Sequence, residues 1–472
     1  MLNTGPVSYE VGANIDATSF GGIAAVHRLV TKLGLVEQID DDLSLLKLHL
    51  PYHESDHVLN MAYNVLCGGT RLEDIERLRH DSAYMNALGA DLIPDPTTAG
   101  DFCRRFTEAD VVALQDAINV VRPKLWAGRG RELLGPVAYI DVDGTIVGTG
   151  GQHKAGMDIS YKGIWGYAPL VVSLANTKEV LYLANRPGNV PSHQGAAEWI
   201  DKAIDLVEPY AQRVCLRGDT DFSLTGHFDR WAQRVDFVFG MDANAALRSR
   251  AEALDASAWK PLSRRVKHQP ASGQTRQREA NHKQRIVTER GYLNSTLNAE
   301  DVAEFDYQPG KCARPYRVVV IRKNLSKSRG DNVLFDEVRY FFYITTRTDL
   351  TPAEVVACAN ERCDQENVIE QLKNGVNALR VPLYDLVSNW AYMVIAALAW
   401  NIKSWWAMML HRKADRRDYI GMEFRRFLAN VVLIPAMVIR RARSITIRII
   451  GYHPELDRFY STWRTIESTA FS

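Results

Sequence analysis

The chain has 472 residues, of which 46% are hydrophobic and 24% are charged. These proportions are ordinary for a folded protein and exclude a largely disordered or fibrous chain, and the length suggests about two to four domains. The formal net charge of +1 excludes a uniformly basic nucleic-acid-binding protein, so any DNA-binding surface must come from local clustering of charge.

Residues 1–125 predict a bundle of short helices. Apolar residues repeat at helical spacing over 23–33, and Asp56 can cap a second helix that ends near Gly68. The segment Pro-Asp-Pro-Thr-Thr at 94–98 predicts a turn and a cap before a further helix. We expect this domain to bind DNA ends or to mediate dimerisation.

Residues 126–245 predict a mixed sheet covered by helices, which is an α/β architecture. Amphipathic patterns indicate helices at 196–207 and 228–233. The expected strands lie at 137–143, 168–174, 180–183, 213–217 and 235–240. A tight turn separates the second and third strands, so these two are expected to form a hairpin.

Residues 246–338 are basic and turn-rich at first and strand-like later, and they predict a β-rich insertion. Its cations Arg264, Arg265 and Lys267 are candidates for contact with DNA phosphates, although a basic run is also typical of a solvated surface. Trp259 in the same stretch either packs against its neighbours or stacks on an unpaired base.

Residues 339–412 predict the second part of the sheet domain, and residues 413–472 predict a basic C-terminal helical region. Thr351 and Pro352 have the residue types of a helix cap and first turn. The uninterrupted part of the apolar stretch at 390–410 is too short to span a bilayer, so we interpret it as a buried helix.

The six cysteines include no C-x-x-C pair, and residues 1–14 lack a signal-peptide pattern. Both observations predict reduced thiols in a cytoplasmic protein.

His53 and His57 form an H-E-x-x-H pattern, which is typical of zinc proteases when both histidines share one helical face. Here Pro51 precedes closely, Ser55 or Asp56 has the type of the helix cap itself, and no convincing third ligand follows. We therefore favour an ordinary helix N-terminus over a zinc site.

Two aspartates follow predicted strands directly, in Asp141-Val142-Asp143-Gly144-Thr145 and in Arg217-Gly218-Asp219-Thr220-Asp221. Phosphodiester chemistry is catalysed by two divalent ions about 4 Å apart, and Mg²⁺ prefers hard oxygen ligands. Asp143 and Asp219 are therefore candidate ligands. Asp141 and Asp221 remain rivals, because each lies two residues away on the same face of a continuing strand.

A third carboxylate can come from a helix packed across these strand ends. Arg362, Glu366 and Lys373 are spaced by four and seven residues, so they share one face of a predicted helix at 360–374. Glu366 would bind a metal, and Arg362 and Lys373 would meet phosphates. The same spacing is also typical of a solvated helix face, where an Arg–Glu pair contributes about 0.2–0.5 kcal/mol.

Together these motifs resemble those of the DDE transposases of bacterial insertion sequences, in the branch with a Tyr-x2-Arg-x3-Glu-x6-Lys motif. Arg362-x3-Glu366-x6-Lys373 matches its last three positions, and the Asp143-Gly144-Thr145 and Arg217-Gly218-Asp219-x-x-Phe222 segments resemble its two aspartate motifs. The segments 53–60, 68–70 and 94–98 resemble the family numbered thirteen-eighty. The tyrosine position is Ala359, a departure that bears on phosphate positioning rather than on the metal site.

The resemblance implies an α/β, ribonuclease-H-like mixed-sheet core with a β-rich insertion, flanked by N- and C-terminal helical regions. It implies that Asp143, Asp219 and Glu366 are the catalytic residues and hold Mg²⁺, for which Mn²⁺ can substitute. The expected function is binding of inverted-repeat DNA ends, metal-dependent cleavage, and strand transfer into target DNA.

The resemblance further implies a homodimer on DNA, without membrane contact, in the bacterial cytoplasm and at the nucleoid when acting. Two alternatives stay open: a stand-alone metal-dependent nuclease of the same fold, and a catalytically inactive DNA-binding derivative. Absence of strand joining would indicate the first, and absence of metal-dependent nicking would indicate the second.

Overall fold

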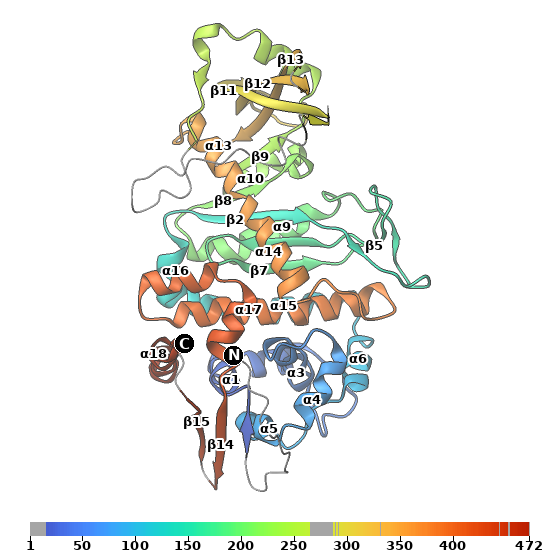
Figure 1. The fold of residues 1–472 in the computed structure, drawn as a ribbon, viewed down its shortest axis with the longest axis vertical. Helices are drawn as coiled ribbons and strands as arrows, with labels where there is room; N and C mark the ends of the chain where they lie inside the picture. Colours follow the sequence, from blue (N-terminus) through green and yellow to red (C-terminus); the bar gives the residue numbers. More distant parts are fainter. Residues whose placement is uncertain are drawn as a thin grey trace.

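The computed structural model describes residues 16–264, 287, 289–290, 292–330, 332–442, 444–451 and 454–471. Figure 1 shows the molecule as a stack of layers, with a large sheet above the long helix α15 (Leu386–Met409) and the N-terminal helices below it.

The large sheet has nine strands in the order β10-β11-β12-β13-β9-β8-β2-β6-β7. β2 runs parallel to β8, and β8 to β9, whereas β6 is antiparallel to β2 and β7. This mixed sheet with helical flanks confirms the expected fold class. Its strands are β2 (Ala138–Gly144), β6 (Leu170–Leu174), β7 (Glu179–Ala184), β8 (Val214–Gly218), β9 (Asp236–Met241), β10 (Lys260–Pro261), β11 (Leu293–Tyr307), β12 (Tyr316–Arg329) and β13 (Asn332–Thr345).

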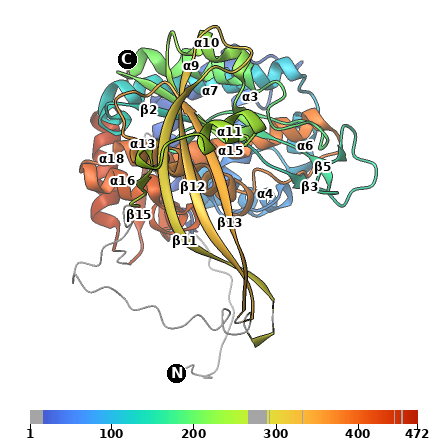
Figure 2. The same ribbon diagram turned by 90° about the horizontal axis from the view of Figure 1, so that it is seen from above.

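The strands of the β-rich segment continue the core sheet. β13 pairs with β9 through four residues, from Phe342 opposite Met241 to Thr345 opposite Val238. The expected boundary at residue 338 falls inside β13. This strand runs from the β-rich segment into the core sheet, where it covers the otherwise open edge of β9. Figure 2 shows the far ends of β11, β12 and β13 projecting beyond the body of the protein.

Short helices fill the N-terminal region, as the apolar periodicity predicts. They are α1 (Ile23–Lys32), α2 (Leu35–Asp42), α3 (Glu54–Leu66), α4 (Ile75–Arg79), α5 (Ser82–Leu88), α6 (Pro96–Cys103), α7 (Glu108–Leu125) and α8 (Arg131–Leu134). Asp95 caps α6 by accepting the backbone N–H of Thr98, within the predicted turn.

The expected cap at Asp56 is wrong, since α3 begins earlier, with His53 as its N-cap. The Asp56 carboxylate instead accepts the backbone N–H of His53 at 2.9 Å, which completes a capping box. His57 is buried, and its ring stacks on Phe102 with 4.4 Å between centroids. The two histidines thus have separate structural roles, which agrees with the rejection of a zinc-protease site.

Helices of the second half flank the sheet, and the last three of them pack on α15 rather than directly on the sheet. The helices of this half are α9 (Ala196–Val207), α10 (Phe228–Trp231), α11 (Ala245–Glu252), α13 (Pro352–Glu361), α14 (Cys363–Glu370), α15, α16 (Lys413–Gly421), α17 (Phe424–Phe427) and α18 (Leu456–Ser468). Thr351 caps α13 and Pro352 stands in its first turn, as predicted.

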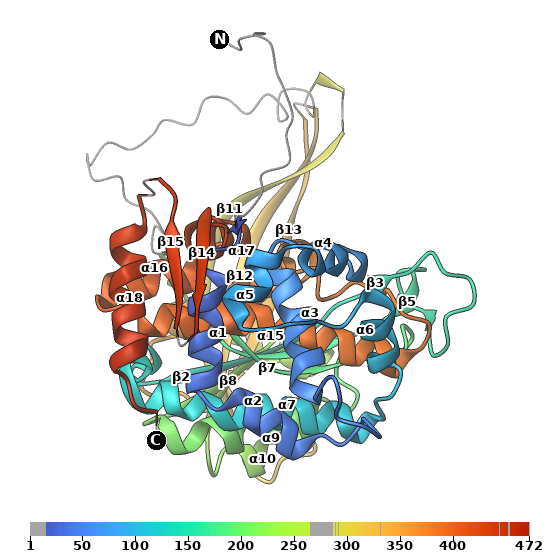
Figure 3. The same ribbon diagram turned by 90° about the horizontal axis from the view of Figure 1, so that it is seen from below.

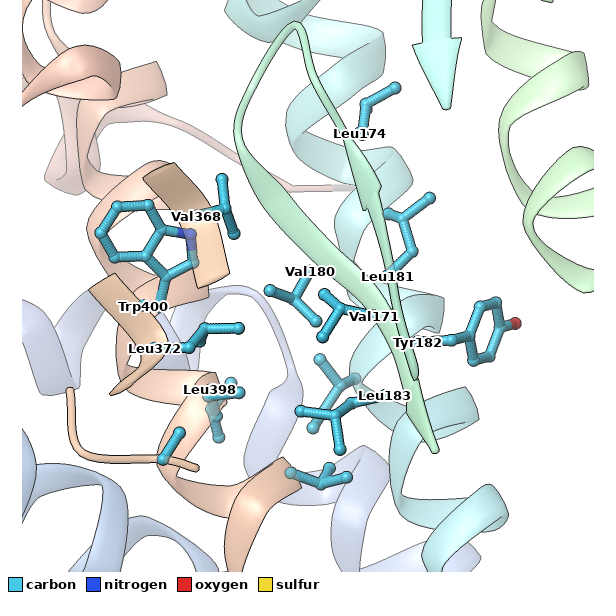
Figure 4. Close-up of a cluster of buried hydrophobic side chains, with 14 of the residues drawn as sticks. Val171, Leu174, Val180, Leu181, Tyr182, Leu183, Val368, Leu372, Leu398 and Trp400 are labelled. Carbon is cyan, nitrogen blue, oxygen red and sulfur yellow. The ribbon is translucent and has the colours of Figure 1, made fainter. Parts of the chain in front are cut away.

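α15 is a buried helix, as expected, and it closes one side of the main core. Figure 4 shows Leu398 and Trp400 of α15, with Val368 and Leu372, on one side of the β6–β7 hairpin that carries Val180. Among the described residues, no helix combines the length and apolarity needed to cross a membrane.

The C-terminal region is not wholly helical, in contrast to expectation. β14 (Ala436–Arg441) and β15 (Ser444–Ile449) form a hairpin, and β14 also pairs with β1 (Ala17–Thr18) (Figure 3). β-branched residues at alternate positions of β15 suit a strand. A further small sheet consists of β3 (Val147–Gly148), β5 (Trp165–Tyr167) and β4 (Asp158–Ile159).

Candidate active site

The two candidate aspartates stand at the same edge of the sheet. β2 and β8 are parallel neighbours in which Asp141 is opposite Arg217. Asp143 lies two residues further along β2, and Asp219 directly follows the last residue of β8. Because the strands run in register, both carboxylates emerge where the strands end.

Glycines beside both aspartates permit close packing at this edge. A Cβ atom on Gly144 would lie 2.9 Å from the Oγ of Ser192, and one on Gly218 would lie 2.8 Å from the Cβ of Phe222. Real Cβ atoms do not approach that closely, so larger residues would push the neighbouring segments away. The Asp-Gly and Gly-Asp pairs in the sequence therefore have a packing reason.

The environment of Asp143 disfavours its negative charge. Burial raises the pKa of Asp143 to about 6; the charge of Asp219 adds to this rise, and Arg362 opposes it. Burial also raises the pKa of Asp219, again against the attraction of Arg362. Two neighbouring, partly desolvated carboxylates of this kind are stabilised by a cation.

Asp141 has a different environment from Asp143. It is fully buried, and its two oxygens accept hydrogen bonds from Nε and Nη2 of Arg217 at 2.7 and 2.8 Å. Arg217 also donates to the backbone oxygen of Cys358 at 3.2 Å, which ties α13 to the sheet. The carboxylate of Asp141 is thus already paired, and Asp143 is the acid of β2 that faces the candidate site.

The helix expected at 360–374 is present, but it is not continuous. α13 and α14 meet at Arg362, and a π-helical turn follows at Gln371–Gly375. From the junction, Nη1 of Arg362 donates to Asp143 at 3.0 Å, and Nη2 lies 4.0 Å from Oε1 of Glu366. The guanidinium therefore lies within reach of two candidate metal ligands, where it supplies positive charge.

Glu366 lies across the strand ends but is directed largely to solvent. Its side chain is 63% exposed, and in the described part of the chain no three acidic, cysteine or histidine side chains are close enough to hold a metal. The structure thus brings Asp143, Asp219 and Arg362 together, while the carboxylate of Glu366 remains outside the cluster.

Gln365, which sequence reasoning missed, fixes α14 on the sheet. Its side chain is buried, donates to the backbone oxygen of Val171 at 3.0 Å, and accepts the hydroxyl of Ser173. A signal was present, because Gln365 shares a helical face with Val368, Ile369 and Leu372, a face that is otherwise apolar. Gln365 thereby fixes the helix that carries Glu366 against β6.

Lys373 reaches the same end of the sheet. Its Nζ donates to the backbone oxygen of Ile146 at 3.3 Å. Burial lowers the pKa of Lys373, as does the nearby charge of Lys162, while Glu370 and Asp143 oppose the shift. Arg362 and Lys373 thus both act electrostatically on Asp143.

The other predicted DNA contacts have mixed outcomes. Arg264 forms two hydrogen bonds with Glu300 of β11, at 2.7 and 2.8 Å, and Arg265 and Lys267 lie outside the described residues. The Cζ atom of Arg322 lies 4.2 Å from the centroid of the Trp259 ring, so Trp259 packs within the fold.

Ala359, which stands where the motif has its tyrosine, lies beside a second hydrophobic core. Ala359 packs against a cluster that α13 shares with the sheet. That cluster is made up of Val137, Cys215, Val238, Val302, Val319, Ile321, Val355, Val356 and Cys358.

The residues present fit a divalent cation. Asp143 and Asp219 supply hard oxygen donors of the type that Mg²⁺ prefers, and their charges are balanced only in part by Arg362. Glu366 offers a further oxygen donor on the far side of the same guanidinium, although its carboxylate lies outside the cluster.

Comparison with known proteins identifies the family of the chain through a single family model. The family model described as transposase DDE domain group 1 matches residues 11–470. No curated protein matches the chain significantly. Among solved structures, a piggyBac transposase synaptic complex with hairpin DNA has a TM-score of 0.36 and 9% identity, covering 88% of this chain and 84% of that one. Because the family model spans nearly the whole sequence, the chain belongs to the transposase DDE domain group 1 family.

Proposed function

We propose that this protein is an insertion-sequence transposase that binds the inverted-repeat ends of its element, cuts them and joins them to target DNA. The observation that carries the proposal is the meeting of Asp143, Asp219 and Arg362 at the ends of two parallel strands, beneath the helix that bears Glu366. Membership of the transposase family supports it. The N-terminal motifs favour the family numbered thirteen-eighty.

Asp143, Asp219 and Glu366 are the proposed ligands of two Mg²⁺ ions, for which Mn²⁺ can substitute. When bound, such ions activate the attacking oxygen and stabilise the leaving oxygen of a phosphodiester. In this proposal Arg362 neutralises Asp143 in the free protein and binds a DNA phosphate in the complex, because guanidinium groups bind both anions well. Lys373 holds a second phosphate.

The proposed partners follow from the reaction. Two element ends must be brought together with target DNA, which favours a homodimer on DNA. The proposed place of action is the bacterial cytoplasm, at the nucleoid.

The test is cleavage of a labelled DNA duplex that carries the element's end, with and without Mg²⁺ or Mn²⁺. Glu366→Gln should lower cutting by about a hundredfold or more while DNA binding persists, because removing even an outer-shell partner of a metal ligand costs about 10–100-fold. The matched control is Glu370→Gln, one turn further along the same helix, which should cut like the wild type. Equal losses in both variants, or cutting that needs no metal, would contradict the proposal.

Strand transfer separates the transposase from a stand-alone nuclease. Ends that are already cut should be joined to a plasmid by the wild type and not by Glu366→Gln. Cutting without joining would indicate the nuclease, and DNA binding with neither activity would indicate an inactive derivative.

A further inference from the structure

A cavity of about 710 Å³ opens beside the candidate active site. It is lined by the residues after β2, the turn of the β4–β5 hairpin and the loop at 186–193, with Asp221 and Lys373 on the side of the active site. Gly144 and Asp221 belong to the same short segments as Asp143 and Asp219, so the cavity is continuous with the site. Its volume falls within the range of roughly 300–1,000 Å³ that small-ligand sites span.

The walls of the cavity are tied together by backbone contacts. The N–H of Gly188 donates to the oxygen of Gly166 at 3.0 Å, and Tyr167 forms a bridge with Pro187. A Cβ atom on Gly188 would lie 2.3 Å from the oxygen of Asp158, so the loop can approach the hairpin only with glycine there. The cavity is thus a built feature of the fold.

A second set of contacts fixes the base of the hairpin to the rest of the protein. Nζ of Lys154 donates to the oxygen of Leu383 at 2.6 Å, and the N–H of Ala155 donates to the oxygen of Tyr384 at 3.0 Å. Figure 1 shows the β5 hairpin projecting from the edge of the large sheet. The hairpin is therefore held at its base while its turn reaches the cavity.

The lining carries an excess of positive charge. Lys162, Arg186 and Lys373 line the cavity, and among the described lining residues Asp221 is the one carboxylate. The Nε and Nη1 atoms of Arg186 donate to the backbone oxygens of Ala168, Pro191, Ser192 and Gln194. Because carbonyl oxygens orient a guanidinium without neutralising it, the positive charge of Arg186 remains available to an anion.

An exposed aromatic ring stands over this basic cavity. Tyr161, at the hairpin turn, is 86% exposed, and Nζ of Lys162 lies 5.4 Å from the centroid of its ring. Sites for single-stranded nucleic acid combine these two elements, because any base can stack on an aromatic face while cations follow the phosphates.

We propose that this cavity takes one unpaired nucleotide of a DNA strand that leads into the active site. Its base stacks on Tyr161, and its phosphates lie near Lys162 and Lys373. The positive charge of Arg186 also attracts these phosphates. The choice of DNA as the polymer rests on the proposed function. The volume of about 710 Å³ suits a single nucleotide, because it falls within the range of small-ligand sites.

The test compares the affinity of the full-length protein for two probes. One is a fluorescent blunt duplex; the other is the same duplex with a short oligothymidine overhang, made in both polarities. Ca²⁺ replaces Mg²⁺ so that no strand is cut, and binding is followed by fluorescence anisotropy. The wild type should bind one overhang duplex more tightly than the blunt duplex. Tyr161→Ala should weaken the binding of that duplex by about tenfold, as expected for one stacked base, and leave the affinity for the blunt duplex unchanged.

Trp165→Ala is the matched control, because Trp165 is 53% exposed on the same hairpin but stands outside the cavity lining. It should bind both probes like the wild type. Lys162→Gln provides an independent variant and should reduce the salt dependence of overhang binding. Equal affinity of the wild type for overhang and blunt duplexes, or equal losses in Tyr161→Ala and Trp165→Ala, would overturn the proposal.

The binding test does not depend on the cutting test. A protein that discriminates the overhang through Tyr161 but never cuts DNA would retain the nucleotide site and lose the proposed function. A protein that cuts DNA in the Glu366-dependent manner but ignores the overhang would retain the function and lose this site.

Discussion

Replacing Asp141 with asparagine should reveal that this acid stabilises the fold rather than the chemistry. Asp141 is fully buried and accepts two hydrogen bonds from Arg217, whose side chain is only 3% exposed. Asparagine keeps the shape but leaves the guanidinium without its buried counter-charge. Removing one partner of a buried ion pair costs about 3–5 kcal/mol. Glu361 lies 3.6 Å from Arg217 but is 64% exposed, so its charge offsets only a small part of this cost. We therefore expect a loss of about 3 kcal/mol in the free energy of unfolding.

The assay is urea unfolding near neutral pH, followed by tryptophan fluorescence, with and without Mg²⁺. The matched variant is Asp143→Asn, two residues along the same strand, which should not be destabilised. Mg²⁺ should stabilise Asp141→Asn and the wild type alike, and folded Asp141→Asn should still cut DNA. An unfolding midpoint equal to that of the wild type would refute the buried-pair argument, and loss of the Mg²⁺ effect would identify Asp141 as a metal ligand.

Two further predictions concern the same edge of the sheet. The pKa of Asp143 is raised from 3.8 to about 6, so ionisation of this acid lowers the stability of the folded protein as pH rises through that window. Asp143→Asn mimics the protonated acid. Its free energy of unfolding should therefore exceed that of the wild type by up to about 3 kcal/mol above pH 6 and equal it below pH 3.8. Urea midpoints across pH in EDTA check this, and a difference that is independent of pH would contradict it. Gln365→Ala removes the hydrogen bonds from this buried side chain to the oxygen of Val171 and the hydroxyl of Ser173, which should cost about 1–3 kcal/mol. Cutting should fall more than DNA binding, whereas equal effects in Asn367→Ala, on the exposed face of the same helix, would argue against a positioning role.

Most of the sheet could be predicted because its signals are local. The strands of the core are short apolar runs bounded by turn residues, and each expected strand is present within a few residues of its predicted limits. Asp143 and Asp219 could be placed at strand ends for the same reason. The β14–β15 hairpin was not predicted, although the β-branched residues at alternate positions of β15 are a local signal for a strand.

Other features depend on contacts between distant segments and could not be predicted. Asp141 and Asp143 have equivalent positions in the sequence, and only the register between β2 and β8 pairs the first with Arg217. The spacing of Arg362 and Glu366 predicts their shared face, but not that the guanidinium reaches across to Asp143. In both cases tertiary packing decides which carboxylate pairs with the arginine.

The β-rich segment helps to position the candidate active site, since it holds α13, the helix that directly precedes the one carrying Glu366. α13 packs Val355, Val356 and Cys358 into the second core, where Val319 and Ile321 of β12 meet Val238 of β9. The following helix α14 is fixed on β6 by Gln365. Arg362 lies at the junction of these two anchored helices, so its position over Asp143 depends on the strands after residue 245 as well as on the core strands.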